Sequence, residues 1–307
     1  MERIEAQRAD TLKHRSGSEP VQNGICGIDY IEAGSESWDT VDGCVIEESP
    51  LTLYVNGVEW VTLMCTPVNQ DELAIGFMLS EGVITSLQEV VVLDISHRGR
   101  VADIWLAHKV ALPNRRVVTS GCVGGVTFTE GSNVAPCPYP GPDVTPAQLL
   151  ALMHQLRQAA VLYPQSRGVH TSALSDGQQL LIVREDVGRH NTLDKLHGAC
   201  VKQGINPSNG VLLTTGRISS EMLHKAASMQ SPIVVSRTSP TSMALELALK
   251  WNITVVGYAC GDRLRIYLDP TDRVCLPVPA QLPAVFAPYA PCMSEVGPRN
   301  KSGGRLI

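Results

Sequence analysis

Residues 184–197 read Arg-Glu-Asp-Val-Gly-Arg-His-Asn-Thr-Leu-Asp-Lys-Leu-His, and this stretch decides the fold. The run just before it, residues 179–183, is mostly apolar and typical of a buried strand. Apolar residues at helical spacing then predict a helix over residues 192–203. Between the strand and the helix, two carboxylates, two guanidinium groups, an imidazole and an amide crowd around Gly188. The connection therefore carries more polar chemistry than a turn needs.

This polar connection has two interpretations. It is either a salt-bridged turn in which Asn191 caps the helix, or a binding loop in which Arg189 and His190 face an anion. Strand ends that lead into helix N-termini are where ligands collect in α/β sheets, which favours a binding loop. The stretch by itself leaves both interpretations open.

The order of strand, polar loop and helix occurs twice more, through loops at residues 214–221 and 236–242, and a last strand ends at residues 258–263. This alternation predicts an α/β fold with a mostly parallel sheet covered by helices. Earlier in the chain, strand-like runs on both sides of Asn56-Gly57 predict a hairpin, because both central positions of such a turn need a positive φ. A smaller, strand-rich α+β unit therefore precedes the α/β domain.

Changes in composition along the chain set the expected domain boundaries. The N-terminal residues show little hydrophobic periodicity, and a proline-rich stretch separates the two units that do show it. We expect a disordered or loosely packed N-terminal tail at residues 1–40, the smaller α+β domain at 41–118, a Gly-rich cysteine loop and Pro-rich linker at 119–144, the α/β domain at 145–275, and a C-terminal tail at 276–307.

Composition and charge exclude several classes of protein. The chain is 44% hydrophobic and 18% charged, as is usual for a globular domain. Its net charge of −5 disfavours a nucleic-acid partner. The N-terminus is polar, and no uninterrupted apolar run reaches the roughly 18 residues of a membrane span. We therefore expect a cytoplasmic protein that makes no contact with membranes.

The nine cysteines argue against disulfides and against a zinc site. They follow no regular spacing and include no Cys-x-x-Cys pair, so neither a disulfide framework nor a zinc ribbon is indicated. His197 and Cys200 lie three positions apart on the predicted helix, but nothing nearby completes a set of four ligands. We expect no metal ion held by the protein itself.

Cys122 is a candidate nucleophile because of its neighbours. It lies between Gly121 and the pair Gly124-Gly125, on backbone that can approach a ligand without obstruction by side chains. One interpretation is a glycine-rich turn that happens to contain an inert cysteine. The other is a mobile arm that carries a nucleophilic thiol.

The polar loops at the strand ends form a candidate anion site. Each loop contributes a basic residue, and hydroxyl side chains lie near the predicted helix starts. Helix N-termini that converge on one place suit a phosphate or a pyrophosphate. Helix capping explains each hydroxyl singly but not the repeated arginines. The candidate residues are Arg189, His190, Arg217, Arg237 and Arg263, with Thr215, Ser219, Ser220, Ser239, Thr241 and Ser242.

Several stretches together resemble one known family, the formate dehydrogenase accessory sulfurtransferases, FdhD. The most specific of them is Glu-Asp-Val-Gly-Arg-His-Asn at residues 185–191. The resemblance extends in family order from about residue 45 to about residue 270 and leaves both tails outside it. The similar stretches are residues 50–57, 65–67, 72–77, 80–82, 185–195, 216–227 and 239–247.

The resemblance implies a fold and an activity. The fold would be a cytidine-deaminase-like three-layer α/β domain without that enzyme's metal, joined to a smaller domain, as a homodimer. The activity would be that of a sulfurtransferase: a cysteine desulfurase passes sulfane sulfur to Cys122 as a persulfide. The chain would then pass this sulfur to the molybdenum of bis(molybdopterin guanine dinucleotide) before that cofactor enters formate dehydrogenase.

The resemblance also implies a cofactor-binding segment. This segment comprises Tyr258, Ala259, Cys260, Gly261, Asp262 and Arg263. The strand-end loops would add further contacts, because guanine nucleotide phosphates would meet their basic and hydroxyl groups. The residues expected there are Arg189, His190, Gly216, Arg217, Ser219, Arg237 and Thr241.

One departure from the family pattern keeps alternatives open. The family's loop reads Cys-x-x-Cys, whereas this chain reads Cys122-Val-Gly-Gly125. Carrying a persulfide needs only one thiolate, so the loss affects a two-thiol mechanism but not a one-thiol carrier. The alternative is a chaperone that binds a guanine nucleotide or the molybdopterin cofactor without sulfur transfer. A hydrolytic deaminase is disfavoured because its zinc-binding signature is missing.

Overall fold

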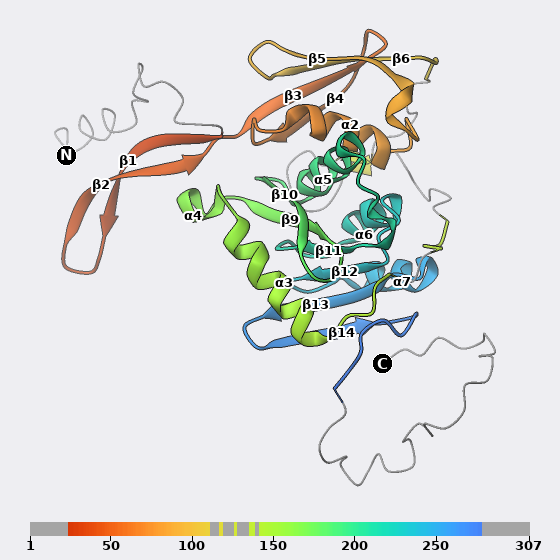
Figure 1. The fold of residues 1–307 in the computed structure, drawn as a ribbon. Helices are drawn as coiled ribbons and strands as arrows, with labels where there is room; N and C mark the ends of the chain where they lie inside the picture. Colours follow the sequence, from red (N-terminus) through yellow and green to blue (C-terminus); the bar gives the residue numbers. More distant parts are fainter. Residues whose placement is uncertain (1–23, 111–116, 119–125, 128–134, 139–140, 278–307) are drawn as a thin grey trace, which may run out of the picture.

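The structure is a computed structural model that describes residues 24–110, 117–118, 126–127, 135–138 and 141–277. Figure 1 shows three parts: a hairpin that projects from the body, a four-stranded sheet with one helix, and a six-stranded sheet with helices on both faces. None of the described helices is long and apolar enough to span a membrane.

The six-stranded sheet forms the centre of the larger domain. Its strand order is β10-β9-β11-β12-β13-β14. The strands are β9 (His170–Ser175), β10 (Leu180–Asp186), β11 (Val211–Thr214), β12 (Ile233–Ser236), β13 (Thr254–Cys260) and β14 (Arg263–Leu268).

The expectation of a mostly parallel sheet is wrong, and the sheet is mixed. Strand β12 pairs in parallel with β11 and with β13, whereas the other three pairings are antiparallel. The physical reason is the length of the connections. The β9–β10 turn around Asp176-Gly177 and the β13–β14 turn are too short for a crossover, so they can join only antiparallel strands. The α/β class itself is confirmed.

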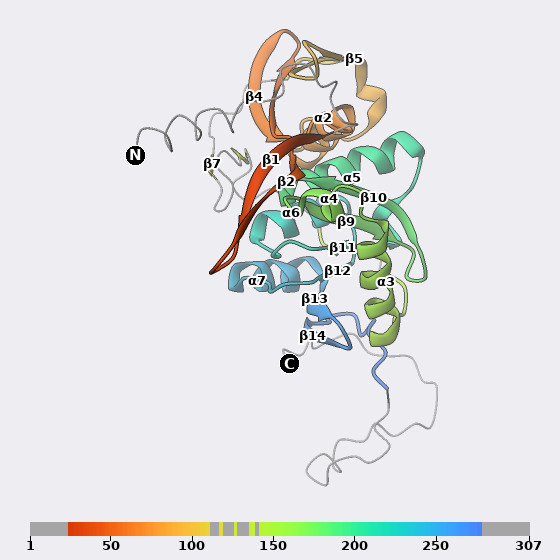
Figure 2. The same ribbon diagram turned by 90° about the vertical axis from the view of Figure 1, so that its left-hand side faces the viewer.

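Helices cover both faces of this sheet, so the larger domain has three layers (Figure 2). One face packs against α3 (Pro146–Ala159), and the other packs against α5 (Arg189–Gln203), α6 (Ser220–Ser228) and α7 (Ser242–Trp251). A single turn, α4 (Tyr163–Ser166), follows α3, and the 3-10 turn η2 (Pro207–Asn209) precedes β11.

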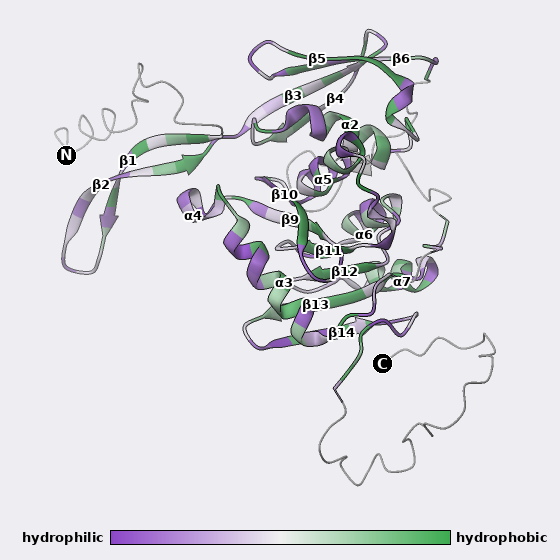
Figure 3. Cartoon of the chain, viewed as in Figure 1, coloured by the Kyte–Doolittle hydropathy of each residue, from purple (hydrophilic) through white to green (hydrophobic). Residues whose placement is uncertain are grey.

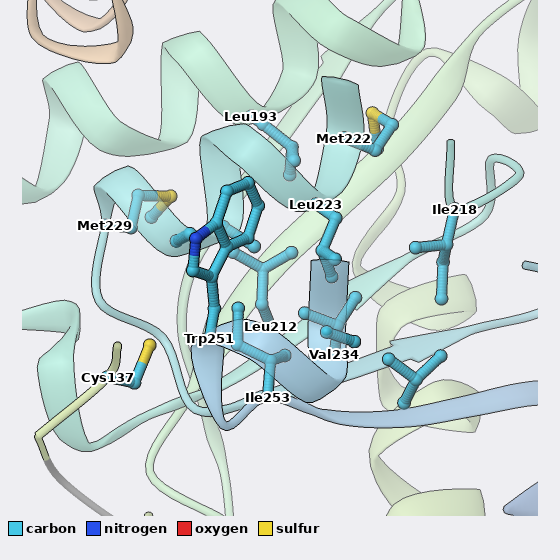
Figure 4. Close-up of a cluster of buried hydrophobic side chains, with 14 of the residues drawn as sticks. Cys137, Leu193, Leu212, Ile218, Met222, Leu223, Met229, Val234, Trp251 and Ile253 are labelled. Atoms are coloured by element: carbon cyan, nitrogen blue, oxygen red, sulfur yellow. The ribbon is translucent and has the colours of Figure 1, made fainter. Parts of the chain in front are cut away.

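The two faces of the sheet hold separate hydrophobic cores. Along β11, Leu212 belongs to the core under α5, α6 and α7, while Val211 and Leu213 belong to the core under α3. Figure 3 shows that strands β11 to β13 are hydrophobic along their length, as strands buried on both faces must be. In Figure 4, Leu223 of α6 and Trp251 of α7 pack toward the sheet.

Helix α3 begins where its sequence indicates. Thr145 is the N-cap, and its side chain accepts a hydrogen bond from the Gln148 N–H while the Gln148 side chain reaches back to the Thr145 N–H. Pro146 occupies the first helical position, where its missing N–H costs nothing. A Thr followed by Pro is a helix-start signal that can be read from the sequence, and α3 begins there.

The smaller domain packs one helix on a four-stranded sheet. The sheet has the order β4-β3-β6-β5, and the turn at Asn56-Gly57 has φ values of 50° and 79°, which confirms the predicted hairpin. The 3-10 turn η1 (Leu87–Glu89) leads into β5. The elements are β3 (Ser49–Val55), β4 (Val58–Cys65), α2 (Gln70–Ser80), β5 (Val90–Ser96) and β6 (Val101–Leu106).

The expected N-terminal tail is partly wrong. Strands β1 (Ile25–Ala33) and β2 (Trp38–Ile46) form a hairpin, so the structured part begins before residue 40. At its base Ile25 packs with Leu162 and Val169 of the larger domain, whereas Trp38 near its tip is 66% exposed. Most hairpin side chains are exposed, which is why hydrophobic burial left little periodicity in the sequence. Residues 41–46 therefore belong with the hairpin rather than with the smaller domain.

Two short paired strands, β7 (Val117–Val118) and β8 (Val126–Thr127), lie on either side of the cysteine loop in sequence. Cys122 itself lies outside the described residues.

Candidate functional site

The stretch at residues 184–197 joins the two domains. The Asp186 carboxylate is fully buried, 2.6 Å from the Lys195 Nζ atom, and accepts hydrogen bonds from the backbone N–H groups of Thr66 and Gly188. Lys195 Nζ also donates to the Thr66 carbonyl oxygen at 3.0 Å. Thr66 directly follows β4 of the smaller domain. The pair of Asp186 and Lys195 therefore links the two domains.

Asn191 does not cap helix α5. The helix begins at Arg189 with Gly188 as its N-cap, and the Asn191 side chain donates to Asp186 Oδ1 and to the Met64 carbonyl oxygen, at 2.8 Å each. The capping interpretation was wrong in detail because the helix starts three residues earlier than its apolar spacing indicates. Asn191 instead orients the buried carboxylate.

A second buried charge pair involves Asp194, the residue just before Lys195 on α5. Lys225 Nζ of α6 is 2.8 Å from both oxygens of Asp194, whose Oδ1 also accepts from the Ser80 hydroxyl of α2. Burial lowers the pKa of Lys225, but the negative charges of Asp194 and Glu81 outweigh burial, so the pKa is raised. Lys225 therefore stays charged where α2, α5 and α6 meet.

Glu185 also has a structural role. Its carboxylate accepts hydrogen bonds from the backbone N–H groups of Val161, Leu162 and Tyr163 at 2.7 to 3.0 Å. These N–H groups lie at the start of α4, where a helix leaves donors without backbone partners. The acidic residues of the stretch thus organise the fold.

Arg189 and His190 are buried, being 5% and 9% exposed. His190 Nε2 is 2.9 Å from a Glu221 carboxylate oxygen and 3.4 Å from the Ser219 hydroxyl. Burial lowers the pKa of His190, with Glu221 acting against the shift and Arg189 adding to it. Gly216 is required here, because a Cβ atom on it would lie 2.9 Å from the Arg189 Cβ atom. This cluster packs the starts of α5 and α6 together.

A pocket of about 170 Å³ lies between α3 and the carboxyl ends of β11, β12 and β13. Ligands bind at this edge of open α/β sheets. Of the candidate residues named from the sequence, the pocket brings together Thr215, Arg237, Ala259, Cys260 and Gly261. The remaining lining residues are Leu150, Met153, His154, Leu156, Arg157, Ala160, Tyr163 and Thr171.

The lining of the pocket combines apolar walls with positive charge. His154, Arg157 and Arg237 are basic and exposed, and none of the lining residues is acidic. The lining is otherwise mostly aliphatic, from α3 and from Ala259. A flat ring that carries an anionic group suits such a pocket.

A distortion at the end of β13 presents the pocket residues. The pairing with β14 shifts register between Gly257 and Cys260, and Tyr258 has a φ of 50°, which non-glycine residues seldom adopt. The Tyr258 ring lies 4.2 Å from the Arg265 guanidinium carbon. The bulge therefore separates Tyr258, outside the pocket lining, from Ala259 and Cys260 within it.

The other predicted site residues do not line this pocket. Ser219 and Thr241 cap α6 and α7, each accepting a hydrogen bond from a backbone N–H of the first helical turn, so the capping interpretation holds for them. Arg217 is exposed on its loop. Asp262 and Arg263 lie beyond β13 with side chains 90% and 89% exposed, 3.7 Å apart. Arg189, His190 and Gly216 lie in the buried cluster.

The α3 wall was not predicted from the sequence. Its pocket residues include Leu150, His154 and Arg157, which follow one another at helical spacing beside the stripe that packs on the sheet. The sequence signal for this wall consists of two basic residues, His154 and Arg157, beside an apolar stripe. Such residues are usual on any exposed helix face, so only the packing distinguishes them.

Burial makes several cysteines unsuitable as nucleophiles. Burial raises the pKa of Cys65 and Cys200 to about 12 and that of Cys137 to about 11. Cys260 is exposed in the pocket lining. His197, the neighbour of Cys200 in a conceivable metal site, is buried, and no group of three or more potential metal-binding side chains occurs among the described residues.

The chain is similar in sequence and in structure to known proteins. The model of the FdhD/NarQ family matches residues 46–274. The chain is 36% identical over 236 residues to the sulfur carrier protein FdhD of Bacillus subtilis, covering 75% of this chain and 90% of that protein. The protein of that name from Staphylococcus haemolyticus is 36% identical over 231 residues, covering 73% and 88%.

A solved structure is similar as well. It is the crystal structure of a Desulfotalea psychrophila protein described as a formate dehydrogenase accessory protein. The TM-score is 0.67 at 25% sequence identity, and the match covers 82% of this chain and all of that one.

Proposed function

Because this chain belongs to the FdhD/NarQ family, we propose that it is a sulfur carrier that serves a formate dehydrogenase. The names of its relatives and of the similar crystal structure support both parts of this proposal. The structural observation that best supports the proposal is the pocket at the carboxyl ends of β11 to β13. This pocket offers a place for the molecule that receives the sulfur.

The first step of the proposed function loads sulfur onto Cys122. The donor is the persulfide of a cysteine desulfurase. The Cys122 thiolate attacks the outer sulfur of that persulfide, the donor's S–S bond breaks, and the donor thiolate leaves. One sulfur atom moves, and no electrons are gained or lost overall. Only one cysteine is needed, which agrees with the glycine at position 125.

The second step delivers the sulfur to a bound substrate, the molybdenum of bis(molybdopterin guanine dinucleotide). The chemistry of the pocket fits one guanosine diphosphate part of this molecule. Aliphatic side chains of α3 and Ala259 can flank a flat ring, and three basic side chains can meet its phosphates. In this proposal the protein binds no metal ion of its own apart from the molybdenum of the substrate.

Delivery as a sulfide ligand requires two electrons, because sulfane sulfur has the oxidation level of the element. In a Cys-x-x-Cys loop, the second thiol supplies them by closing a disulfide with the first. Gly125 cannot do this. We therefore propose that an external thiol pair supplies the two electrons and is oxidised to a disulfide as the sulfur leaves Cys122.

We also propose that the protein assembles as a homodimer.

Complementation of a bacterial strain that lacks its own FdhD tests this function. The measured quantity is formate dehydrogenase activity in cell extracts, with formate dehydrogenase protein levels checked by immunoblot. We expect the wild-type chain and Cys275→Ala to restore activity, because Cys275 is exposed and lies outside the pocket lining, and Cys122→Ala to restore none. Equal restoration by Cys122→Ala would refute the proposed carrier role.

A further inference from the structure

The hairpin of β1 and β2 has little support from the rest of its own chain. Its base is packed, because Ile25 contacts Leu162 and Val169 there, but the strands then project away from the body (Figure 1). A two-stranded hairpin without further cover is marginally stable in water. This hairpin, residues 25–46 and named the arm, nevertheless exposes large apolar side chains on both strands: Tyr30, Ile31, Trp38 and Val45. The arm is therefore suited to be covered by a partner.

The charge of the arm is exclusively negative. Its sequence contains no Lys, Arg or His, and its carboxylates are those of Asp29, Glu32, Glu36, Asp39 and Asp42. The strand register sets Asp29 directly opposite Asp42 on one face, and Glu32 directly opposite Asp39 on the other. Like charges directly opposite each other destabilise an antiparallel pair. Charged side chains, lysine above all, protect edge strands, but such protection does not require a single sign. The arm thus calls for a partner that supplies positive charge.

A surface of opposite charge lies beside the base of the arm. Residues 144–175 contain no Asp or Glu, and within them the exposed residues Val161 and Arg167 lie on either side of α4. Arg167 forms no ion pair with any described residue. The nearby Glu185 carboxylate is held by three backbone N–H groups at the start of α4. The surface at residues 161–167, named the α4 corner, thus offers an apolar side chain and an available positive charge.

We propose that the arm of one copy of this chain binds the α4 corner of a second copy. Helix α4 packs against β2, so the arm and the corner lie at the same end of the molecule (Figure 2). A single two-fold axis can therefore place each arm on the other copy's corner. Pairing of arm with arm is disfavoured, because carboxylates would face carboxylates. The inference rests on the homodimer of the proposed function and adds the surfaces that form it.

Charge-reversal variants of the full chain test this interface, with sedimentation equilibrium as the measurement. The arm variant carries Asp39→Lys and Asp42→Lys. These changes turn both like-charge pairs into opposite-charge pairs, which should stabilise the hairpin itself. Loss of the dimer in this variant would therefore not be explained by unfolding of the arm. The corner variant carries Arg167→Glu at an exposed position.

A matched control changes the net charge by the same amount as the arm variant but at another place. It carries Glu59→Lys and Asp94→Lys, both at exposed positions of the smaller domain. Asp94 also lies directly opposite a carboxylate, that of Asp103, so the control reproduces the local change in strand pairing. Circular dichroism and the melting temperature check the fold of every variant.

We expect the wild type and the control to form dimers. The dimer dissociation constant should rise about tenfold or more in the arm variant and in the corner variant, because each sets like charges against each other in both arm contacts. An equal mixture of the two variants should associate again. In the mixed dimer the reversed arm of one copy meets the reversed corner of the other, and the second contact keeps its native charges.

Two results would overturn the inference in different ways. If the arm variant or the corner variant dimerised as tightly as the wild type, or if their mixture did not associate, the proposed interface would be wrong and the homodimer would use another surface. A monomeric wild type would overturn the homodimer together with the interface. Sulfur loading of Cys122 is measured separately, so failure of the interface and failure of the carrier function are distinguishable.

Discussion

Gly76 of α2 and Asp194 of α5 meet backbone to backbone. A Cβ atom on Gly76 would overlap the carbonyl oxygen of Asp194, and a Cβ atom on Gly198 of α5 would overlap the carbonyl oxygen of Glu72 in the same way. The two helices come from different domains, so these two glycines set the distance between the domains. This close approach allows Asp194 to accept a hydrogen bond from Ser80 of α2.

Replacement of either glycine should therefore destabilise the protein. For Gly76→Ala, separation of the helices should cost about 3 kcal/mol, and the better helix propensity of alanine should return about 1 kcal/mol. We expect the free energy of unfolding in urea to fall by about 2 kcal/mol. Gly27→Ala is the matched control, because a Cβ atom there would meet nothing within 4 Å. Equal stability of the Gly76 and Gly27 variants would contradict the close contact.

The buried pair of Asp186 and Lys195 predicts that substitutions of the two residues have strongly non-additive effects on the free energy of unfolding. Asp186→Asn leaves the Lys195 charge unpaired in a site where both side chains have no exposed surface. Such a loss costs about 3 to 5 kcal/mol. Lys195→Met should cost a similar amount, but the double variant should cost much less than the sum. Urea unfolding of the four proteins measures this coupling, and additive effects would show that the two charges do not stabilise each other.

His197 predicts how stability depends on pH. Burial, with help from the Lys225 charge, lowers its pKa to about 4, whereas an unfolded histidine titrates near 6.5. Between these values the unfolded chain binds a proton that the folded chain does not. The free energy of unfolding should therefore fall as the pH drops from 6.5 toward 4, by about 3 kcal/mol from this residue alone.

The variant His197→Gln isolates this contribution. Other groups titrate in the same range, so the test compares the two stability curves between pH 4.5 and 7 rather than their absolute values. We expect a shallower fall for His197→Gln than for the wild type. Parallel curves for His197→Gln and the wild type would contradict the buried, neutral imidazole.

Alkylation of cysteines predicts where a nucleotide binds. Iodoacetamide should modify exposed Cys260 and Cys275 and spare Cys65 and Cys200, whose pKa burial raises to about 12. Guanosine diphosphate should slow the modification of Cys260, which lines the pocket, but not that of Cys275, which does not. Peptide mass spectrometry gives both rates. Unchanged modification of Cys260 at saturating nucleotide would place the ligand elsewhere.

Local signals in the sequence predicted those elements that are determined locally. The Thr145-Pro146 start of α3 and the Asn56-Gly57 hairpin depend on backbone conformations and hydrogen bonds within a few residues. The three units of strand, loop and helix were predicted for the same reason. Strand direction in the sheet was not, because it depends on which strands become neighbours.

The polar residues of the 184–197 stretch could not be assigned from the sequence because their partners are distant. Asp186 bonds to Thr66, which lies 120 residues earlier in the chain. A carboxylate that binds a ligand and one that fixes a domain interface look the same in one sequence. For a similar reason the sequence predicted only some of the residues that line the pocket. Cys260 lies in a segment that the family resemblance indicates, whereas Arg157 comes from a helix with no distinctive motif.

The central claim is that Cys122 carries sulfur, and intact-protein mass spectrometry tests it most directly. The full chain is incubated with a cysteine desulfurase and cysteine, with Cys122→Ala and Cys275→Ala treated in parallel. The account predicts that the wild type and Cys275→Ala each gain one sulfur atom that cyanide removes, and that Cys122→Ala gains none. If the wild type gained no sulfur, or Cys122→Ala gained as much as the wild type, the account of this chain as a one-cysteine sulfur carrier would be contradicted.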